Sequence, residues 1–356
     1  MTVDAILIGA GQRGHHVYGR WALERPDRIR FVAVADPRAD RLERFGEAHQ
    51  IPLSHRFGNP DTVLSMPQFA PACIVASPDR THHRHVTAAL RAGYHVLAEK
   101  PMAAAFAQCA DLVDAASRSR GTLQIAHVLR FTPFFQTLHE VVQSGRLGEV
   151  VTVEHRENVR SWHMAHSYVR GNWARRELAA PMIVAKCSHD FDILHWNLNS
   201  PVRRLSSVGT LFEFRPERAP IGATRRCTDP CPVDDCPYDA RRVYLNPTLT
   251  GWPVHVITDD LSHEGRLAAL RQSPYGVCAY LAESNVVDHQ VVAMELASGT
   301  SVVLTMHGHS HEEARTMRYD GTRATLRGIF GRRQEIVVID HITAEPEEIP
   351  IQHARG

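Results

Sequence analysis

Short apolar runs separated by longer, more polar segments are the main pattern in the first third of the chain. Each run suits a strand buried on both faces of a parallel sheet, and each segment between runs suits a helix that covers that sheet. The predicted strands are 5–8, 31–35, 72–77, 94–98 and 123–127, and the predicted helices are 12–25, 39–50, 81–93 and 104–119. This alternation predicts an α/β domain with a doubly wound parallel sheet over residues 1–128.

The pattern changes from about residue 129. A predicted helix at 133–144 leads into a strand at 150–155, and the later runs are typical of antiparallel strands. These runs are 204–214, 276–283, 286–297, 300–307, 315–319, 323–328 and 335–340. Residues 215–256 are rich in Pro, Arg and Cys and poor in aliphatic side chains, which indicates a long ordered insertion or flap. We therefore expect a second, α+β domain over 129–356 with a large, mostly antiparallel sheet.

Length and charge narrow the classes of function. A chain of 356 residues exceeds one ordinary core and suits two domains. The net charge of +1 favours neither nucleic acid nor a membrane surface as a partner. The sequence shows no secretory signal and no apolar run of the ~20 residues that span a bilayer. We expect a cytoplasmic protein whose seven cysteines are mostly thiols or metal ligands.

A glycine-rich turn follows the first predicted strand. Gly9 permits a tight turn, Gly11 lets a diphosphate approach the backbone, and Gly14 lets the following helix pack on the strand. The second predicted strand ends at Asp36, 22 residues after Gly14, where a carboxylate can accept the ribose hydroxyls. The spacing predicts a dinucleotide site, with the phosphates at the start of the first helix.

Several further motifs lie at the predicted carboxyl ends of strands. They are Ser77-Pro78 followed by His82, Ala92-Gly93-Tyr94-His95-Val96, and Glu99-Lys100-Pro101. Together with the glycine turn and Asp36, these motifs resemble the Gfo/Idh/MocA oxidoreductases over essentially the whole chain. The resemblance implies a Rossmann domain followed by a domain with an open antiparallel sheet. It also implies NAD or NADP, substrates that are sugars, cyclitols or their derivatives, and a homodimer or homotetramer joined through the sheet.

The same motifs give a set of expected cofactor contacts. These are Gly9, Gly11, Gln12, Arg13, Gly14, Asp36, Ser77, Pro78, His82, Glu99 and Lys100. The carboxylate of Asp36 repels a 2′-phosphate, which favours NAD. Arg38 lies two residues further on and keeps NADP as the second alternative.

Lysine is rare, because only Lys100 and Lys186 occur among 40 basic residues. Arginine keeps its proton in proteins, whereas burial and neighbouring charge tune lysine. The resemblance assigns to Lys100 a hydrogen bond to the reacting hydroxyl beside the nicotinamide. If Lys186 lies close to Lys100, repulsion would lower the pKa of one lysine and supply a neutral amine.

The second motif of that family is Asp-x-x-x-His-x-x-Asp. His189 and Asp192 match its last two positions, but Ala185 stands at the first and Lys186 follows it. This departure resembles a subgroup in which lysine replaces the function of the first aspartate. We expect His189 to be the base, with Lys186 as the other candidate for moving the proton, and His189 and Asp190 to lie at the substrate. The alternative for Lys186 is a salt bridge with Asp190 or Asp192. We expect a helix that starts near residue 188, on which Asp192 would point with His189 and orient its imidazole.

Aromatic and imidazole side chains gather between residues 162 and 173. Trp162 and His163 offer a ring face and hydrogen-bonding nitrogens, which suit a sugar. We expect both to line the substrate. The alternative is an ordered loop that packs on the Rossmann domain.

Three cysteines fall close together in the polar insertion. Cys227, Cys231 and Cys236 would serve a structural zinc ion with a fourth ligand, for which Cys278 is the first choice and Cys187 or a histidine the second. A reduced or disulfide-bonded loop and an iron–sulfur cluster are the alternatives.

These observations lead to one functional hypothesis and two alternatives. The hypothesis is an NAD(P)-dependent oxidoreductase that moves a hydride between nicotinamide and a secondary hydroxyl of a sugar, cyclitol or glycoside. The first alternative is an NAD-dependent glycosidase or lyase that oxidises the sugar transiently and eliminates the aglycone. The second is a regulatory protein that binds NAD without catalysis.

Overall fold

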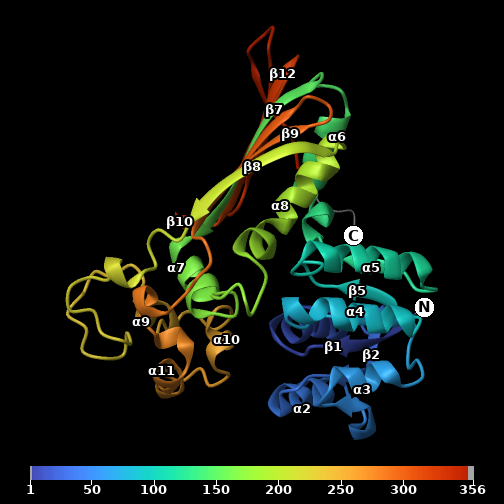
Figure 1. Ribbon diagram of the computed structural model, residues 1–356, viewed down its shortest axis with the longest axis vertical. Coiled ribbons are helices and arrows are strands. Elements are labelled where there is room, and N and C mark those ends of the chain that lie inside the picture. The colour runs from blue at the N-terminus through green and yellow to red at the C-terminus, as the bar shows by residue number, and fades with distance from the viewer. Residues whose placement is uncertain (1, 352–356) are drawn as a thin grey trace. The chain divides into compact units, whose positions relative to one another are not determined.

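Two compact units make up the chain, Met1–His127 and Val128–Gly356. The computed structural model describes residues 2–351, so the outermost ends of the two expected domains lie outside the described residues (Figure 1). Among the described residues, none of the helices is both long and apolar enough to cross a membrane.

A six-stranded parallel sheet forms the centre of the first unit. Its strand order is β3-β2-β1-β4-β5-β6, with each strand parallel to its neighbours. The strands are β1 (Val3–Ile8), β2 (Ile29–Ala35), β3 (Arg56–Phe57), β4 (Ala72–Val75), β5 (His95–Ala98) and β6 (Leu123–Ile125). The order reverses between β1 and β4, and ligands of such sheets bind outside the carboxyl ends of the strands at this point. The predicted doubly wound parallel sheet is confirmed.

Helices cover both faces of this sheet because successive side chains of β1 point to opposite sides. Ile6 and Ile8 pack in one apolar cluster with side chains of α3, α4 and α5. Ala5 and Leu7 pack in another cluster with side chains of α1 and α2. The helices are Gly14–Gly19, which continues as α1 (Arg20–Glu24), and α2 (Ala39–Ala48), α3 (Pro60–Ser65), α4 (His82–Arg91) and α5 (Phe106–Arg118).

An eight-stranded sheet forms the second unit, in the order β14-β13-β12-β11-β7-β10-β9-β8. Its strands are β7 (Val150–Arg160), β8 (Val202–Thr210), β9 (His289–Leu296), β10 (Ser301–Ser310), β11 (Ala314–Gly321), β12 (Ala324–Phe330), β13 (Gln334–Asp340) and β14 (Pro346–Glu348). Within the described residues β10 and β7 pair in parallel, and the other neighbours pair antiparallel. The predicted mostly antiparallel sheet is confirmed.

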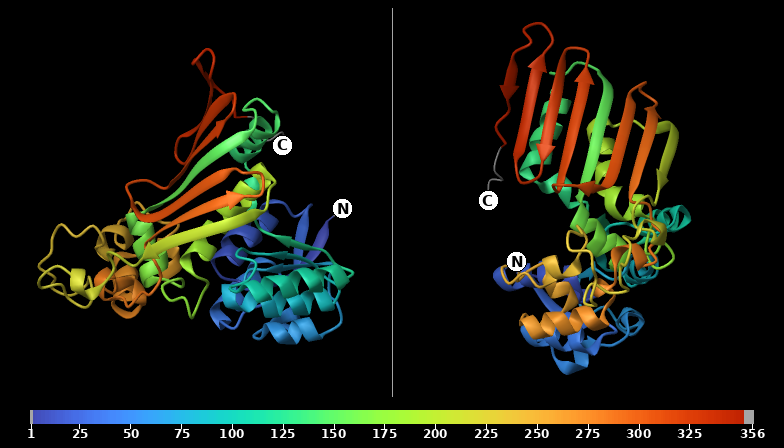
Figure 2. Two further views of the ribbon diagram at one scale, coloured as in Figure 1. Left: turned by 45° about the horizontal axis from the view of Figure 1, so that its top comes forward. Right: turned by 90° about the vertical axis from the view of Figure 1, so that its left-hand side faces the viewer.

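One face of this sheet is covered by α6 (Pro133–Gln143) and α8 (Met182–Leu198), as the right-hand view of Figure 2 shows. Alternate residues of β10 point to the two faces of the sheet. Val302, Leu304 and Met306 are buried, whereas Val303 is exposed. The two long helices therefore supply the core of the second unit, and the other face of the sheet carries no helix of this chain in that view.

Two sequence expectations are wrong in this unit. The run 276–283 forms short 3₁₀ turns, Pro274–Gly276 and Ala279–Leu281, instead of a strand. The helix expected to start near residue 188 starts at Met182, directly after Pro181, because proline with its fixed φ favours the beginning of a helix.

The insertion is folded, and it shares a small apolar cluster with the segment that follows it. Besides irregular chain it contains α9 (Ala240–Tyr244) and α10 (Val254–Ile257), and α11 (His263–Gln272) follows it. A small cluster of buried side chains joins these pieces, made of Ala240, Tyr244, Leu270 and Tyr275.

Candidate functional site

The glycine turn has the geometry that dinucleotide binding requires. Gly9 adopts φ +95°, and a Cβ there would lie 2.7 Å from the Ala76 carbonyl oxygen. A Cβ on Gly14 would lie 2.0 Å from the Gly9 carbonyl oxygen, so helix and turn touch at this residue. A Cβ on Gly11 would meet only the end of the flexible Arg41 side chain, at 3.2 Å. Gly9 and Gly14 are therefore required by the fold, whereas Gly11 leaves room for a ligand against the backbone.

Asp36, directly after β2, is bound to this turn. The Ala10 amide donates to its Oδ2 at 2.8 Å, and the Arg38 amide donates to its Oδ1 at 2.9 Å. Each carboxylate oxygen retains a second lone pair for a ribose hydroxyl. The Arg38 guanidinium forms an ion pair with Asp40.

Glu99 connects the end of β5 to the first helix. Its Oε1 accepts hydrogen bonds from Arg13 Nε at 2.6 Å and from the Tyr18 hydroxyl at 2.8 Å. Burial, and then the negative charge of Glu99, raises the pKa of Tyr18. The Glu99 side chain is 7% exposed and holds Arg13 and Tyr18, and its contact with the cofactor stays a prediction. Gln12 lies beside Arg13 at the start of this helix.

His82 joins two segments of the expected cofactor site, and its contact with the cofactor stays a prediction. It is 1% exposed at the start of α4. One ring nitrogen lies 2.7 Å from the Ser77 carbonyl oxygen and the other 2.8 Å from the Pro101 carbonyl oxygen. The ring thereby links the Ser77-Pro78 turn to the segment that carries Lys100, which directly follows β5.

Ser77 is held by its own side chain as well. Its Oγ lies 2.9 Å from a ring nitrogen of His85 and accepts a hydrogen bond from the Thr81 hydroxyl at 2.9 Å. The Pro78 carbonyl accepts from the same hydroxyl at 2.7 Å. Thus the first unit gathers the glycine turn, Asp36, Ser77 and Lys100 at the carboxyl ends of its parallel strands.

In the second unit, Lys186 of α8 belongs to a buried network of charges. Its Nζ lies 3.2 Å from Oε1 of Glu157 and 3.0 Å from Oε1 of Glu313. Burial alone would lower the pKa of Lys186, but these carboxylates raise it above its usual range. Lys186 is therefore a charged ammonium in an ion pair, and its partners differ from the expected Asp190 and Asp192.

The two aspartates of α8 have other partners. Asp190 is fully buried, and its Oδ1 lies 2.8 Å from both His155 Nε2 and Arg315 Nε. Burial alone would raise the pKa of Asp190, but the Arg315 guanidinium and His155 hold it well below its usual range. Asp192 accepts two hydrogen bonds from Arg130, at 2.6 and 2.7 Å. The enclosed carboxylate of Asp190 anchors the helix that carries His189, and its contact with a substrate stays a prediction.

An aromatic cluster surrounds Trp162 and His163, at the end of β7. The Trp252 ring of the insertion lies 5.1 Å from the Trp162 ring and 4.9 Å from the His163 ring. His163 Nδ1 lies 2.9 Å from Oε1 of Glu313, which is also bound to Lys186. Burial alone would raise the pKa of Glu313, but His163 and Lys186 hold it well below its usual range. The two expected sugar-binding residues thus adjoin the charged network.

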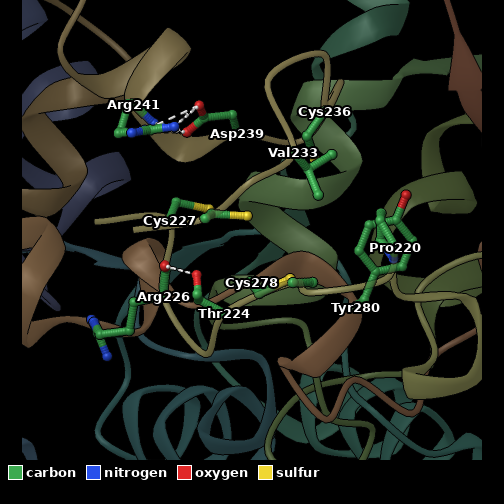
Figure 3. A pocket seen from close by; sticks show the side chains of 12 residues that line it. Pro220, Thr224, Arg226, Cys227, Val233, Cys236, Asp239, Arg241, Cys278 and Tyr280 are labelled. Carbon is green, nitrogen blue, oxygen red and sulfur yellow. Dashed lines mark hydrogen bonds and ion pairs between the residues drawn. The ribbon is translucent and has the colours of Figure 1, made fainter. Parts of the chain in front are cut away.

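The four cysteines proposed as zinc ligands line one small cavity of about 30 Å³ (Figure 3). Cys227, Cys231, Cys236 and Cys278 are all free thiols, and Cys187 lies elsewhere, buried in α8. Among residues 2–351, no three His, Cys, Asp or Glu side chains are arranged as ligands of one metal ion. The zinc site stays a prediction.

Four important side chains were missed by the sequence reasoning: Tyr18, Glu157, Glu313 and Arg315. Glu157 and Arg315 lie opposite each other on β7 and β11. A strand pairing between residues so distant in sequence leaves no local pattern. The available signal was the charge of Glu157 at a position of β7 that alternation places in the core.

The fold and the glycine turn define the class of this protein. It has a Rossmann unit with a dinucleotide-binding turn, followed by an α/β unit on an eight-stranded sheet. Residues 3–127 match the family model described as "Oxidoreductase family, NAD-binding Rossmann fold". Residues 139–348 match the model described as "Oxidoreductase family, C-terminal alpha/beta domain". The chain belongs to the Gfo/Idh/MocA oxidoreductase family, which confirms the resemblance drawn from the motifs.

Two curated relatives match with moderate identity. Inositol 2-dehydrogenase 1 of Saccharopolyspora erythraea is 30% identical over 161 residues, which is 45% of this chain and 42% of that protein. D-glucoside 3-dehydrogenase of Escherichia coli (strain K12) is 33% identical over 150 residues, which is 40% of each protein. The matching part of this chain thus spans less than half of the length of these relatives.

Solved structures show the same fold. Aldose-aldose oxidoreductase from Caulobacter crescentus, complexed with glycerol, has a TM-score of 0.69 at 15% identity and covers 100% of this chain and 85% of that one. WlbA dehydrogenase from Bordetella pertussis, in complex with NADH and UDP-GlcNAcA, has a TM-score of 0.66 at 17% identity and covers 94% and 82%. At these identities the likeness concerns the fold.

Proposed function

We propose that the protein is an NAD-dependent oxidoreductase that transfers a hydride between nicotinamide and a secondary hydroxyl of a sugar, cyclitol or glycoside. One observation carries the proposal. The turn at Gly11, where a Cβ meets only a flexible side chain, and Lys100 both lie at the carboxyl ends of the same parallel sheet. A dinucleotide and a proton-bearing amine are the two components that oxidation of an alcohol requires.

The residues of the first unit fit NAD. In our proposal the backbone from Gly9 to Gly14 holds the diphosphate, and Asp36 accepts the ribose hydroxyls. When bound, the nicotinamide supplies the hydride acceptor. NADP is disfavoured because the Asp36 carboxylate repels a 2′-phosphate and because the Arg38 guanidinium already forms an ion pair with Asp40.

Three side chains are assigned to the proton and the oxygen. Lys100 donates a hydrogen bond to the reacting oxygen, and His189 takes the hydroxyl proton. Lys186 is a poor base because Glu157 and Glu313 raise its pKa, so we assign to it the electrostatic stabilisation of a developing oxyanion. This choice selects His189 over Lys186, the two candidates that the sequence left open.

The substrate class is inferred from the aromatic cluster and from the names of the relatives. The faces of Trp162 and Trp252 suit the apolar side of a sugar ring, and His163 suits its hydroxyls. Inositol and a glucoside, named in the two curated relatives, belong to the class that we propose for this chain.

Turnover of a substrate panel tests the proposal. Purified protein is mixed with NAD and with sugars, cyclitols and aryl glycosides, while reduced nicotinamide and released aglycone are followed together. We expect reduced nicotinamide to accumulate in proportion to the substrate consumed. Aglycone release without net reduced nicotinamide would instead establish the glycosidase or lyase alternative. Tight NAD binding with no turnover of any substrate would favour the regulatory alternative.

We also propose a homodimer or homotetramer that forms through the eight-stranded sheet. Val208, Ala293 and Val303 are exposed on its outer face, and the register places Ala293 directly opposite Val303. Light scattering of the wild-type protein should give a multiple of the chain mass. The double substitution V208R and V303R should reduce the measured mass. A monomeric wild-type chain would contradict this proposal.

A further inference from the structure

Two separate parts of the chain bring four thiols to one cavity. Cys227, Cys231 and Cys236 come from the polar insertion, and Cys278 comes from the segment after α11. The Cys227 amide donates to the Gly276 carbonyl and the Cys278 amide donates to the Arg225 carbonyl, each at 2.9 Å. These two hydrogen bonds belong to a short antiparallel bridge between Arg226 and Val277, which fixes Cys227 and Cys278 on neighbouring segments of the chain.

Positive side chains surround the same cavity. Arg170 is 6% exposed, and its Nη2 lies 3.6 Å from the Cys227 sulfur and 2.7 Å from the Tyr238 carbonyl oxygen. Arg241 lines the cavity as well, where it forms an ion pair with Asp239. Four thiolates around a divalent cation leave a net charge of −2, and the Arg170 guanidinium beside Cys227 offsets part of it, because Arg241 is already paired with Asp239.

The position of these cysteines differs from that of core cysteines. Cys73 is fully enclosed in the main apolar cluster of the first unit. Cys227, Cys231 and Cys236 are half-buried in an insertion whose own apolar cluster is small. A segment of this kind gains stability from a cross-link between distant parts of the chain.

We propose that Cys227, Cys231, Cys236 and Cys278 form a tetrahedral thiolate site for one Zn²⁺ ion, which fixes the insertion to the segment after α11. Binding replaces the four S–H bonds by four Zn–S bonds and releases four protons to solvent, with no change of oxidation state. Among the described residues no three of these side chains already have the arrangement of metal ligands, so zinc binding requires the four sulfurs to come closer together. The proposal does not depend on the catalytic activity.

Metal analysis of the full chain, purified without an affinity tag that binds metal, tests this site. We expect one zinc per chain, and we expect C227S, C231S, C236S and C278S each to lose at least nine-tenths of it. C109S is the matched control, because Cys109 is a partly buried thiol of α5, away from the cavity, and this variant should keep its zinc. Cobalt added to metal-free protein should give the intense visible absorption of a tetrahedral thiolate complex in the wild type and not in C236S.

Folding is checked separately, so that loss of metal is not mistaken for loss of structure. NADH binding by the first unit and far-UV circular dichroism should be unchanged in all five variants. The proposal would be overturned if the wild-type protein contained no zinc and if added Zn²⁺ did not slow the reaction of its four thiols with a thiol reagent. Loss of two hydrogens in the mass of the intact chain, which indicates a disulfide, would overturn it too. So would iron with acid-labile sulfide in protein isolated without oxygen.

Discussion

Lys186 of α8 and Glu157 of β7 form an ion pair of 3.2 Å, and the side chain of Glu157 is 1% exposed. The other oxygen of the same carboxylate lies 2.5 Å from Arg315 of β11. One buried negative charge therefore holds two cations from different elements. This arrangement fixes the helix that carries His189 against the sheet, and it keeps Lys186 charged.

Removal of the Glu157 charge should destabilise the second unit. In E157Q the ammonium of Lys186 and the guanidinium of Arg315 face each other without their shared carboxylate, and such a loss costs about 3–5 kcal/mol. Urea unfolding monitored by tryptophan fluorescence measures it. E24Q is the control, because its exposed ion pair with Arg20 contributes less than about 1 kcal/mol. An E157Q variant as stable as E24Q would contradict the role given to the network.

Two alanine substitutions in the glycine turn should have opposite effects on fold and on binding. G14A puts a Cβ 2.0 Å from the Gly9 carbonyl oxygen, so we expect loss of the folded first unit. G11A meets only the end of Arg41 and should fold, but its methyl group occupies the place of the diphosphate. Thermal unfolding and NADH fluorescence titration separate the two effects. Wild-type NADH affinity in G11A would remove this turn from the cofactor site.

Lys100 should be needed for turnover and dispensable for cofactor binding. K100R keeps the positive charge but changes the shape of the donor, and a guanidinium gives up a proton far less readily than an ammonium does. We expect kcat to fall by roughly 10²–10⁴-fold, the usual contribution of a general acid or base, with the Kd for NAD within a few fold of wild type. Steady-state kinetics with the best substrate of the panel provides the measurement. A K100R enzyme with wild-type kcat would show that Lys100 does not act on the reacting oxygen.

Asp36 should set the preference for NAD over NADP. D36N removes the negative charge and keeps a side chain of similar size with one acceptor oxygen for the Ala10 or Arg38 amide. Because repulsion of a 2′-phosphate is lost, the ratio of kcat/KM for NADP to that for NAD should rise by about tenfold or more. R38A is the control for the alternative that Arg38 binds the 2′-phosphate of NADP. A wild-type ratio that favours NADP and falls in R38A would reverse our assignment of the cofactor.

Stability should fall in mild acid because of His166. Its Nδ1 lies 2.6 Å from the Tyr244 hydroxyl, and burial, helped by nearby His163 and Arg170, lowers the pKa of His166 from 6.5 to about 3. Between these values the unfolded chain binds the proton and the folded chain does not, so protonation favours unfolding. The free energy of unfolding should decrease by up to about 1.4 kcal/mol per pH unit for this group as the pH falls below about 6.5.

H166N provides the comparison for this pH dependence. The variant lacks one titrating ring, so its unfolding free energy should fall less steeply between about pH 6 and pH 4.5, by roughly 1 kcal/mol per pH unit. His85 remains in both proteins with a pKa lowered to about 4 by burial and by Arg84, so some slope persists in H166N. Equal slopes in the two proteins would mean that His166 is protonated in the folded state.

The sequence by itself determined the parts of this protein that depend on neighbours along the chain. The Gly9, Gly11 and Gly14 spacing, the strand that ends at Asp36 and the Glu99-Lys100 pair predicted a dinucleotide site, because turn, strand and helix start are local features. The alternation of strands and helices predicted the parallel sheet. The residues at the ends of the predicted strands indicated which side chains share its carboxyl edge.

Only the tertiary structure decided which residues, distant in sequence, form ion pairs with one another. Glu157 and Arg315 are brought together by the pairing of β7 with β11, and Lys186 joins them because α8 packs on that sheet. The sequence offered Asp190 as a substrate ligand and as a partner of Lys186, whereas the fold turns Asp190 inward to His155 and Arg315. Side-chain direction on a helix follows from the surface that the helix covers, and that surface is set by strand order, which the local pattern does not contain.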